Sequence, residues 1–209
     1  MTQKYPKLLE FDTKLSNHPP AFYGMLMAMP AVYDVASFGD ERGAFCAPWS
    51  CTNLPSKEIN LNPMQHNVSF SKRGTVRGMH WQVDKLLGKL VTCLQGKIID
   101  AVVDIRKKSD TYGKVITIPL TGHNSIMSSQ SLQCVWVPPG FAHGFCALED
   151  DSIVSYLQSG EYDPTLERSF NALDTNMNIQ WDLGQLKPIM SDKDQKAPSF
   201  ESLSDKDLL

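Results

Sequence analysis

The chain lacks the features that mark several large classes of protein. No apolar run approaches the roughly 20 residues that a bilayer-spanning helix needs, and the opening residues Met1–Pro6 lack the apolar core of a secretory signal. The net charge is −3 over 209 residues, so the basic surface typical of nucleic-acid-binding or membrane-surface proteins is not expected. These absences predict a cytoplasmic protein with neither a nucleic acid nor a membrane as its partner.

The cysteine pattern argues against a framework of disulfide bonds. The chain has five cysteines, an odd number, and no Cys-x-x-Cys spacing. Cys93, Cys134 and Cys146 lie in apolar, strand-like runs, which predicts buried free thiols. Free thiols fit a reducing compartment.

The composition is that of an ordinary globular protein, with 42% hydrophobic and 21% charged residues, so one packed domain is expected. The distribution of polar, apolar and strand-like residues divides the chain into three parts. We predict an N-terminal arm over residues 1–30, a single domain over 31–198, and a polar tail over 199–209.

The central part is rich in short β-strand patterns. Asn67–Ser71 alternates polar and apolar residues, and Lys89–Leu94, a Gln95-Gly96 turn and Ile98–Ile105 predict a β-hairpin. Similar patterns predict strands over Lys114–Leu120, Leu132–Val137 and Ser152–Leu157. Many short strands without long helical periodicity indicate an all-β protein, an antiparallel sandwich or barrel.

Two strand-like segments each carry one histidine. The first reads Arg77-Gly78-Met79-His80-Trp81-Gln82, and the second runs from Pro138 to Phe145 and contains Gly140 and His143. Metal-binding jelly rolls of the cupin kind have His-x-His before such a Pro-x-Gly-x-x-His segment, but here Gln82 replaces the second histidine. Two histidines fall short of the three or four ligands that a transition metal needs, so no metal is predicted. A histidine without metal can act as a general base near neutral pH.

A series of blocks, in order, resembles the nucleotide-sugar 3,5-epimerase family typified by dTDP-4-dehydrorhamnose 3,5-epimerase. The blocks are Asp40–Phe45, similar to the strand that leads into the family's barrel, then Gln65–Ser69, Arg77–Gln82, Lys89–Val91, Val103–Arg106 with Ser109 and Gly113, Pro139–Phe145, Tyr156, Tyr162–Pro164 and Ser191–Asp194. The resemblance implies a cupin-type jelly roll with short helices near the C-terminus. It also implies an isomerase without a cofactor, and a homodimer that exchanges N-terminal strands.

The resemblance also implies a mechanism. The substrate would be a 4-keto-6-deoxyhexose on a nucleoside diphosphate, whose C3 and C5 protons are acidic because removing either gives an enolate. His80 matches the base, with Asp194 as the carboxylate that orients it. Tyr156 matches the acid on the opposite face, and Lys89 matches the cation that stabilises the enolate oxygen.

Further residues match substrate-binding positions of the family. Forked guanidinium groups suit a diphosphate, and Arg42 and Arg77 match that role. The other matches are Gln65 and Asn67 for the nucleoside or sugar, Phe45 and Tyr162 for the base, and His143 for either the pocket or a loop contact.

Several of these residues have structural alternatives. Tyr156 lies in an alternating strand and could belong to the core, while Lys89 could be a solvated lysine at a strand edge. Asp192 competes with Asp194 as the partner of His80. We expect Arg106 to form a structural ion pair with Asp104, and Gly78 to let the chain pass close to its neighbours.

The sequence departs from the family at Ala47, where relatives often carry a glutamate thought to help read the base. The nucleotide is therefore open between dTDP and alternatives such as GDP or CDP. Functional alternatives are a mono-epimerase at C3 or C5, a ketoisomerase, a non-catalytic sugar-nucleotide binding module, and a metal-dependent dioxygenase. Residues 1–30 and 50–62 look longer than the family pattern, and extra dimer contact is one hypothesis for them.

Overall fold

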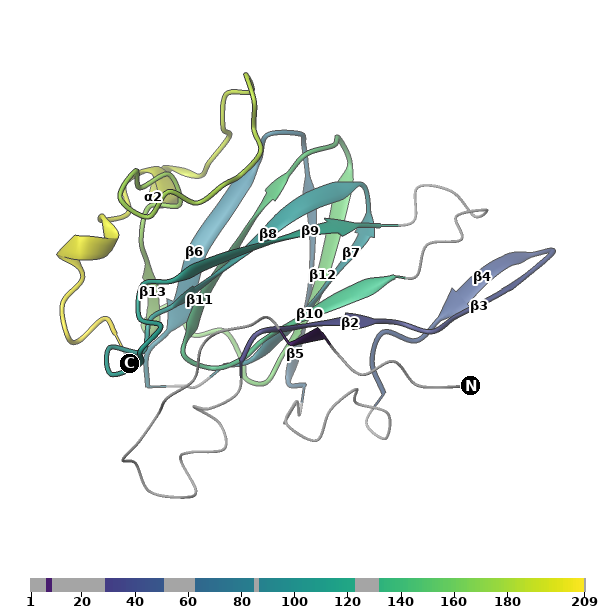
Figure 1. The fold of residues 1–209 in the computed structure, drawn as a ribbon, viewed down its shortest axis with the longest axis horizontal. Helices are drawn as coiled ribbons and strands as arrows, with labels where there is room; N and C mark the ends of the chain where they lie inside the picture. Colours follow the sequence, from purple (N-terminus) through teal and green to yellow (C-terminus); the bar gives the residue numbers. More distant parts are fainter. Residues whose placement is uncertain (1–6, 9–28, 51–62, 85–86, 123–131, 209) are drawn as a thin grey trace.

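The computed structural model describes residues 7–8, 29–50, 63–84, 87–122 and 132–208, which form two antiparallel sheets and a separate two-stranded hairpin (Figure 1). The six-stranded sheet has the order β1 (Lys7–Leu8), β2 (Ala31–Asp34), β10 (Gln133–Val137), β7 (Lys89–Gln95), β12 (Ser152–Gln158) and β5 (Gln65–Ser71). The five-stranded sheet has the order β13 (Glu167–Ser169), β6 (Val76–Gln82), β11 (Phe141–Ala147), β8 (Lys97–Asp104) and β9 (Val115–Thr121). The antiparallel all-β fold expected from the strand patterns and the jelly roll implied by the resemblance are both confirmed.

Strand alternation sorts the apolar residues into three layers. Residues from both sheets, such as Val91 on β7 and Val102 on β8, meet in a cluster between the sheets. A second cluster covers the outer face of the five-stranded sheet with residues of the C-terminal segment, including Phe170 and Trp181. A third lies on the outer face of the six-stranded sheet around Trp136. Because successive side chains of a strand point to opposite faces, one strand contributes side chains to two of these layers.

The segment around Gly96 corrects one expectation. Lys89–Leu94 and Ile98–Ile105 form β7 and β8 as predicted, but they are not a hydrogen-bonded hairpin. β7 pairs with β10 and β12, whereas β8 pairs with β11 and β9. The turn at Gly96, with φ of 78°, instead carries the chain from one sheet to the other. Both strands are largely buried, so their apolar sequences could not tell a hairpin from a corner between sheets.

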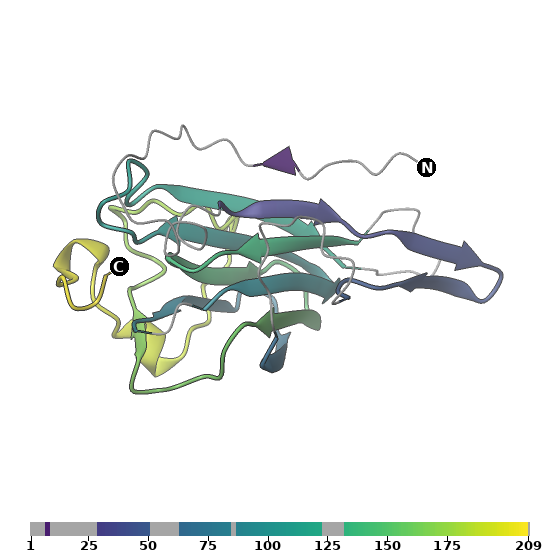
Figure 2. The same ribbon diagram turned by 90° about the horizontal axis from the view of Figure 1, so that it is seen from below.

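A second correction concerns Asp40–Phe45, expected as one strand. The chain turns there, so that β3 (Ser37–Asp40) pairs with β4 (Gly43–Cys46). The carboxylate of Asp40 accepts hydrogen bonds from the backbone and guanidinium of Arg42, and Gly43 has a φ of 129°, both of which suit a tight turn. The hairpin projects beyond the two sheets (Figure 2).

The C-terminal segment is more than a polar tail. It contains α2 (Asp192–Gln195) and a 3₁₀ turn, Phe200–Ser202. Phe200 is 7% exposed and packs against Phe170 and Tyr112. Leu203 and Leu208 pack against the same cluster, and Asp207 forms an ion pair with Arg168, so several residues bind this stretch to the core.

Other structural expectations are confirmed. Arg106 forms a buried ion pair with Asp104, and a Cβ at Gly78 would lie 2.6 Å from the Cα of Gly144, so only glycine fits between β6 and β11. Four cysteines are free: Cys46, Cys93, Cys134 and Cys146. Cys51 and nearly all of the proposed N-terminal arm lie outside the described residues. Over the part of the chain that is described, no helix has the length and apolar character to cross a membrane.

Candidate active site

Strand alternation places polar side chains between the sheets at one end of the barrel. On β7, Lys89 shares a face with Val91, which belongs to the cluster between the sheets. On β12, Tyr156 shares a face with Val154 in the same way, and it packs partly against that cluster. The apolar interior therefore continues into a polar end without a break in the strands.

Two cavities open at this polar end. The first has a volume of about 300 Å³, and the second about 580 Å³. Both are lined by the same five side chains, which come from both sheets and the loop before β13: His80, Lys89, Tyr156, Tyr162 and Glu167. Cavities of this size match small-ligand sites.

His80 is paired with Asp194. The Nε2 atom of His80 lies 2.6 Å from Oδ1 of Asp194. The aspartate is a residue of α2. Ser191 is the N-cap of this helix, because its hydroxyl accepts a hydrogen bond from the backbone N–H of Asp194. This start turns Asp194 inward, to 4% exposure, while Asp192 remains exposed. Asp194 is therefore the carboxylate that contacts the histidine, as expected, and Asp192 is not.

The electrostatics of the pair favour an ionised carboxylate. Burial alone would raise the pKa of Asp194, but hydrogen bonds from His80, Ser191 and the Gly78 backbone outweigh it and hold the pKa below its usual value. A carboxylate on one ring nitrogen fixes the imidazole tautomer. The other ring nitrogen of His80 is then available to accept a proton.

Lys89 reaches the cavities from the opposite sheet. Burial lowers its pKa to about 8, and the negative charge of Asp100 partly opposes that shift. Its ammonium group donates to the His80 carbonyl at 3.4 Å, a long hydrogen bond. A poorly solvated ammonium lining a cavity is suited to stabilise a negative charge on a bound molecule.

Tyr156 faces the same space from β12. Burial raises the pKa of its phenol, and Arg77 partly opposes this. The phenol is therefore protonated at neutral pH, the state that a proton donor needs. Its cross-strand neighbour on β5 is Asn67, which lines the first cavity together with Gln65.

The second cavity has a cationic side. Arg77 lines it and donates to Ser71 and the Phe70 carbonyl. Lys72 and Lys193 line the same cavity. These charges could bind an anionic group beside the space shared with the first cavity.

His143 lies directly opposite His80 on the neighbouring strand. Its Nε2 atom is 2.7 Å from Oδ2 of Asp100, and the two side chains are 6% and 0% exposed. Asp100 Oδ1 is buried without a hydrogen-bond partner among the described residues. His143 lines the second cavity, as the first expectation has it, and its side-chain partner Asp100 lies on strand β8 and not in a loop.

Two expected binding residues lie elsewhere. Arg42 and Phe45 belong to the projecting β3–β4 hairpin and line neither cavity of their own chain. The Phe45 side chain is 69% exposed, and Arg42 forms an ion pair with Asp40. The remaining expected residues, nine in all, line a cavity: His80, Lys89, Tyr156, Asp194, Gln65, Asn67, Arg77, His143 and Tyr162.

Within the described ranges, no group of three or more His, Cys, Asp or Glu residues is arranged to hold a metal ion. Comparison with known proteins identifies the family of this site. The family described as dTDP-4-dehydrorhamnose 3,5-epimerase matches residues 27–202. The chain belongs to the dTDP-4-dehydrorhamnose 3,5-epimerase family.

Individual members of the dTDP-4-dehydrorhamnose 3,5-epimerase family agree. The enzyme of that name from Shigella flexneri is 34% identical over 173 residues, covering 81% of this chain and 90% of the relative. The crystal structure of dTDP-6-deoxy-D-glucose-3,5-epimerase from Legionella pneumophila, in complex with dTDP-4-keto-L-rhamnose, has a TM-score of 0.77 at 32% identity and covers 86% of this chain and 92% of that one. A dTDP-4-dehydrorhamnose 3-epimerase from Streptomyces niveus is 36% identical, covering 81% and 79%. The protein is therefore an isomerase of the epimerase type.

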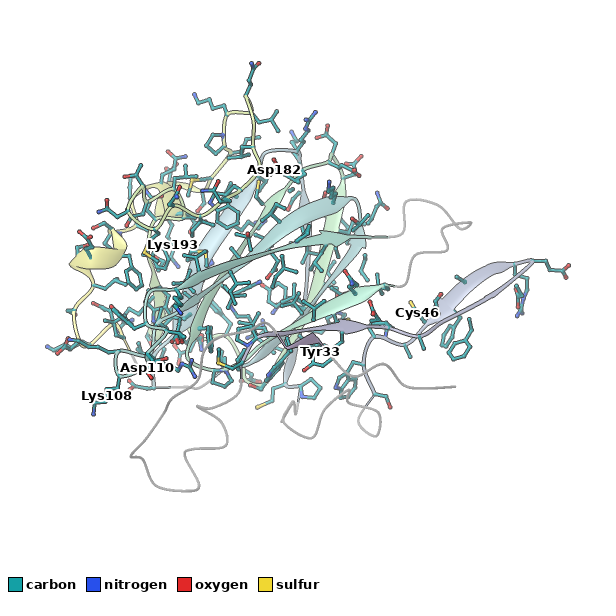
Figure 3. The ribbon with its side chains drawn as sticks, in the orientation of Figure 1. Tyr33, Cys46, Lys108, Asp110, Asp182 and Lys193 are labelled. Atoms are coloured by element: carbon teal, nitrogen blue, oxygen red, sulfur yellow. The ribbon has the colours of Figure 1, made fainter. Side chains whose placement is uncertain are left out.

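The site of this family member also contains residues that sequence reasoning missed. Glu167 lines both cavities and accepts hydrogen bonds from Tyr162 and Lys193. Lys193 is a residue of α2 and is labelled in Figure 3. Gln82, considered only as a poor metal ligand, lines the first cavity. The signal for Gln82 was its i+2 spacing from His80, which places both side chains on one face of β6. Glu167 gave no comparable signal, because β13 has only three residues.

Proposed function

We propose that the protein inverts C3 and C5 of a nucleotide-linked 4-keto-6-deoxyhexose. The observation that carries the proposal is that His80 and Tyr156 line the same cavities from opposite sheets. Inversion requires a base and an acid on opposite faces of one carbon, and two facing sheets supply opposite walls.

The proposed proton path uses residues of the chain and solvent water. The free ring nitrogen of His80 removes the proton from C3 or C5, and Asp194 stabilises the imidazolium that results. The electrons of the broken C–H bond pass to the C4 oxygen, where the Lys89 ammonium stabilises the enolate. Tyr156 then protonates the carbon from the other face, and its phenolate and the imidazolium exchange protons with water before the next step. The proton gained at carbon therefore comes from solvent.

Arg77 supports diphosphate binding, because it lines the second cavity beside the lysines at its rim. Gln65 and Asn67 would contact the sugar or nucleoside, and Tyr162 would lie against the base. We propose dTDP as the nucleotide, supported by the names of the family members. Ala47 lacks the carboxylate that relatives often carry near the base, so selectivity for dTDP is expected to rest on the other contacts.

A homodimer with exchanged N-terminal strands is part of the proposal. The exposed hairpin residues Phe38 and Phe45 are 66% and 69% exposed, and Phe70 on the edge strand β5 is 70% exposed. No strand of the described residues pairs with the outer edge of β5, and this edge, together with the exposed aromatic side chains, favours a second copy as the cover. Exchange would also bring Arg42 and Phe45 to a partner's cavities. Light scattering should give twice the chain mass of 23.4 kDa, and a single-chain mass at micromolar concentration would contradict the exchange.

We also propose a cytoplasmic location, supported by the four free cysteines, which a reducing compartment maintains. Fractionation of the native cells, with the protein detected by antibody, would test it, and recovery from an oxidising compartment would contradict it.

An epimerase acting only at C3 is the second candidate, favoured by the likeness to the Streptomyces niveus 3-epimerase. One base and one acid on opposite walls can serve C3 alone as well as both carbons, and the exchange experiment separates the two outcomes.

The test is proton exchange in heavy water. We expect dTDP-4-keto-6-deoxyglucose to gain deuterium at C3 and C5, followed by NMR, and His80→Asn to slow both exchanges by ~10²–10⁴-fold. His66→Asn is the matched control, because His66 is an exposed residue of β5 and its ring contacts the hydroxyl of Ser155 on β12. Deuterium at C3 alone would establish the mono-epimerase. Exchange with neither a dTDP- nor a GDP- or CDP-linked keto sugar would refute the enzymatic proposal.

A further inference from the structure

The loop that carries Tyr162 leads from β12 in one sheet to β13 in the other. Tyr162 lines both cavities, yet its side chain is 48% exposed. About half of the residue is therefore not packed against the protein, so the polar contacts of this loop are the remaining constraints on the ring.

Two glutamines bind the backbone of this loop from opposite sheets. Oε1 of Gln65, on β5, accepts the backbone N–H of Tyr162 at 2.7 Å. Oε1 of Gln82, on β6, accepts the next backbone N–H, that of Asp163, at 2.6 Å. Consecutive amides are thus held by side chains of the two facing walls of the site.

A third contact holds the other end of the tyrosine. The Tyr162 hydroxyl donates to Oε2 of Glu167 at 2.9 Å. Glu167 is the direct cross-strand partner of Gln82. Neighbouring residues on β6 and β13 therefore fix the backbone beside Tyr162 and the tip of its ring.

The chemistry of Gln82 indicates which of its atoms matters. A backbone N–H can only donate, so the amide oxygen of Gln82 must face Asp163 and the Nε2 group must face away. Nε2 is buried and has no hydrogen-bond partner among the described residues. A buried glutamine with an unpaired amide is costly, which suggests that its place depends on the oxygen.

We infer that Gln82 is a positioning residue, which together with Gln65 clamps the Tyr162–Asp163 backbone and so fixes the Tyr162 ring over the cavities. The inference rests on the proposed function, in which Tyr162 lies against the nucleotide base. Gln82 acts through Tyr162, so it serves binding of the nucleotide-linked substrate and not the proton transfers at His80.

The first test needs no substrate. Gln82→Met removes the acceptor at nearly constant volume, and Gln82→Glu retains an acceptor oxygen. Hydrogen exchange of the peptide containing Tyr162 and Asp163 should become faster in Gln82→Met and return toward the wild-type rate in Gln82→Glu. Gln95→Met is the control, because Gln95 lies at the end of β7 away from Lys89 and the cavities. This substitution should leave the exchange rate of the peptide unchanged. Unchanged exchange in Gln82→Met would overturn the clamp.

The second test uses kinetics. Losing one hydrogen bond should raise KM by about three- to tenfold, with kcat changed by less than about twofold. In a Tyr162→Ala background the same substitution should have almost no further effect, because residues that act through each other are not additive. A full, additive effect in that background would mean that Gln82 contacts the substrate itself, and would overturn the inference.

Two outcomes keep this inference separate from the proposed function. An inactive wild-type protein would refute the epimerase proposal, while the exchange experiment would still report the clamp. If Gln82→Met fails to fold, Gln65→Met offers the same exchange measurement from the other sheet, and an unchanged rate there would equally count against the clamp.

Discussion

The site contains two histidine–aspartate pairs with nearly the same geometry and very different surroundings. His80 and His143 are register partners on β6 and β11, and each lies 2.6–2.7 Å from a carboxylate. The His80 side chain is 28% exposed, whereas that of His143 is 6% exposed. The pairs also differ in origin, because Asp100 comes from the adjacent strand β8 and Asp194 from α2. The two pairs therefore differ in exposure and hardly in hydrogen-bond length, and the proposal that His80 is the base rests on its greater exposure.

The largest effect is expected from breaking the accessible pair. Asp194→Asn should lower kcat by ~10²–10³-fold, because the amide no longer stabilises the imidazolium that forms on His80. Steady-state kinetics with the keto sugar would measure it. Asp192→Asn is the matched control two residues away, on the exposed side of α2. Equal losses in the two variants would show that the contact with His80 is not what matters.

Lys89 interacts with both pairs, because it donates a hydrogen bond to the His80 carbonyl and the charge of Asp100 raises its pKa. Its pKa of about 8 lies below the value of 10.5 expected for an unfolded chain. If the ammonium stabilises the enolate, kcat/KM should fall about tenfold per pH unit above pH 8.

Lys89 itself should make unfolding less favourable as pH rises between pH 8 and 10.5, because there the unfolded chain binds the extra proton. Above pH 9 the buried thiols of Cys93, Cys134 and Cys146 act in the opposite sense, because burial raises their pKa to about 11 and the folded chain keeps those protons. The contribution of Lys89 is therefore the difference between the wild-type protein and Lys89→Met.

A pH profile of kcat/KM and of the melting temperature would measure both trends. Lys89→Met should remove the alkaline limb of the profile and the contribution of Lys89 to the stability trend together. An alkaline limb that persists in this variant would assign it to another group.

The smallest effect on turnover is expected at the buried pair. Asp100→Asn should lower the free energy of unfolding by about 3 kcal/mol, because it disrupts a buried pair, while changing kcat at pH 7 less than about fivefold. The alkaline limb should move to lower pH, since Asp100 raises the pKa of Lys89. Chemical denaturation and kinetics on the folded fraction would measure these effects. A loss of kcat as large as in Asp194→Asn, without loss of stability, would abolish the distinction between the pairs.

Sequence reasoning reached most of this site through strand periodicity and motif resemblance. Alternation predicted β5, β7, β10 and β12 nearly at their observed bounds, and thereby which side chains share a face. It failed at Gly96, where a turn between two buried strands joins different sheets. It also failed at Glu167, because a strand of three residues has too little pattern to be recognised.

By itself the sequence determined most of the strands, through their local alternation, and the family, through the motifs that contain His80, Lys89 and Tyr156. Only the tertiary structure decided between Asp194 and Asp192 as the partner of His80, 114 residues from Asp194, and paired Asp100 with His143, 43 residues away. It likewise decided that Gln82 meets the backbone of Asp163, 81 residues away. The physical reason is that alternation is a local property of a strand, whereas these contacts depend on how sheets and loops pack across the barrel.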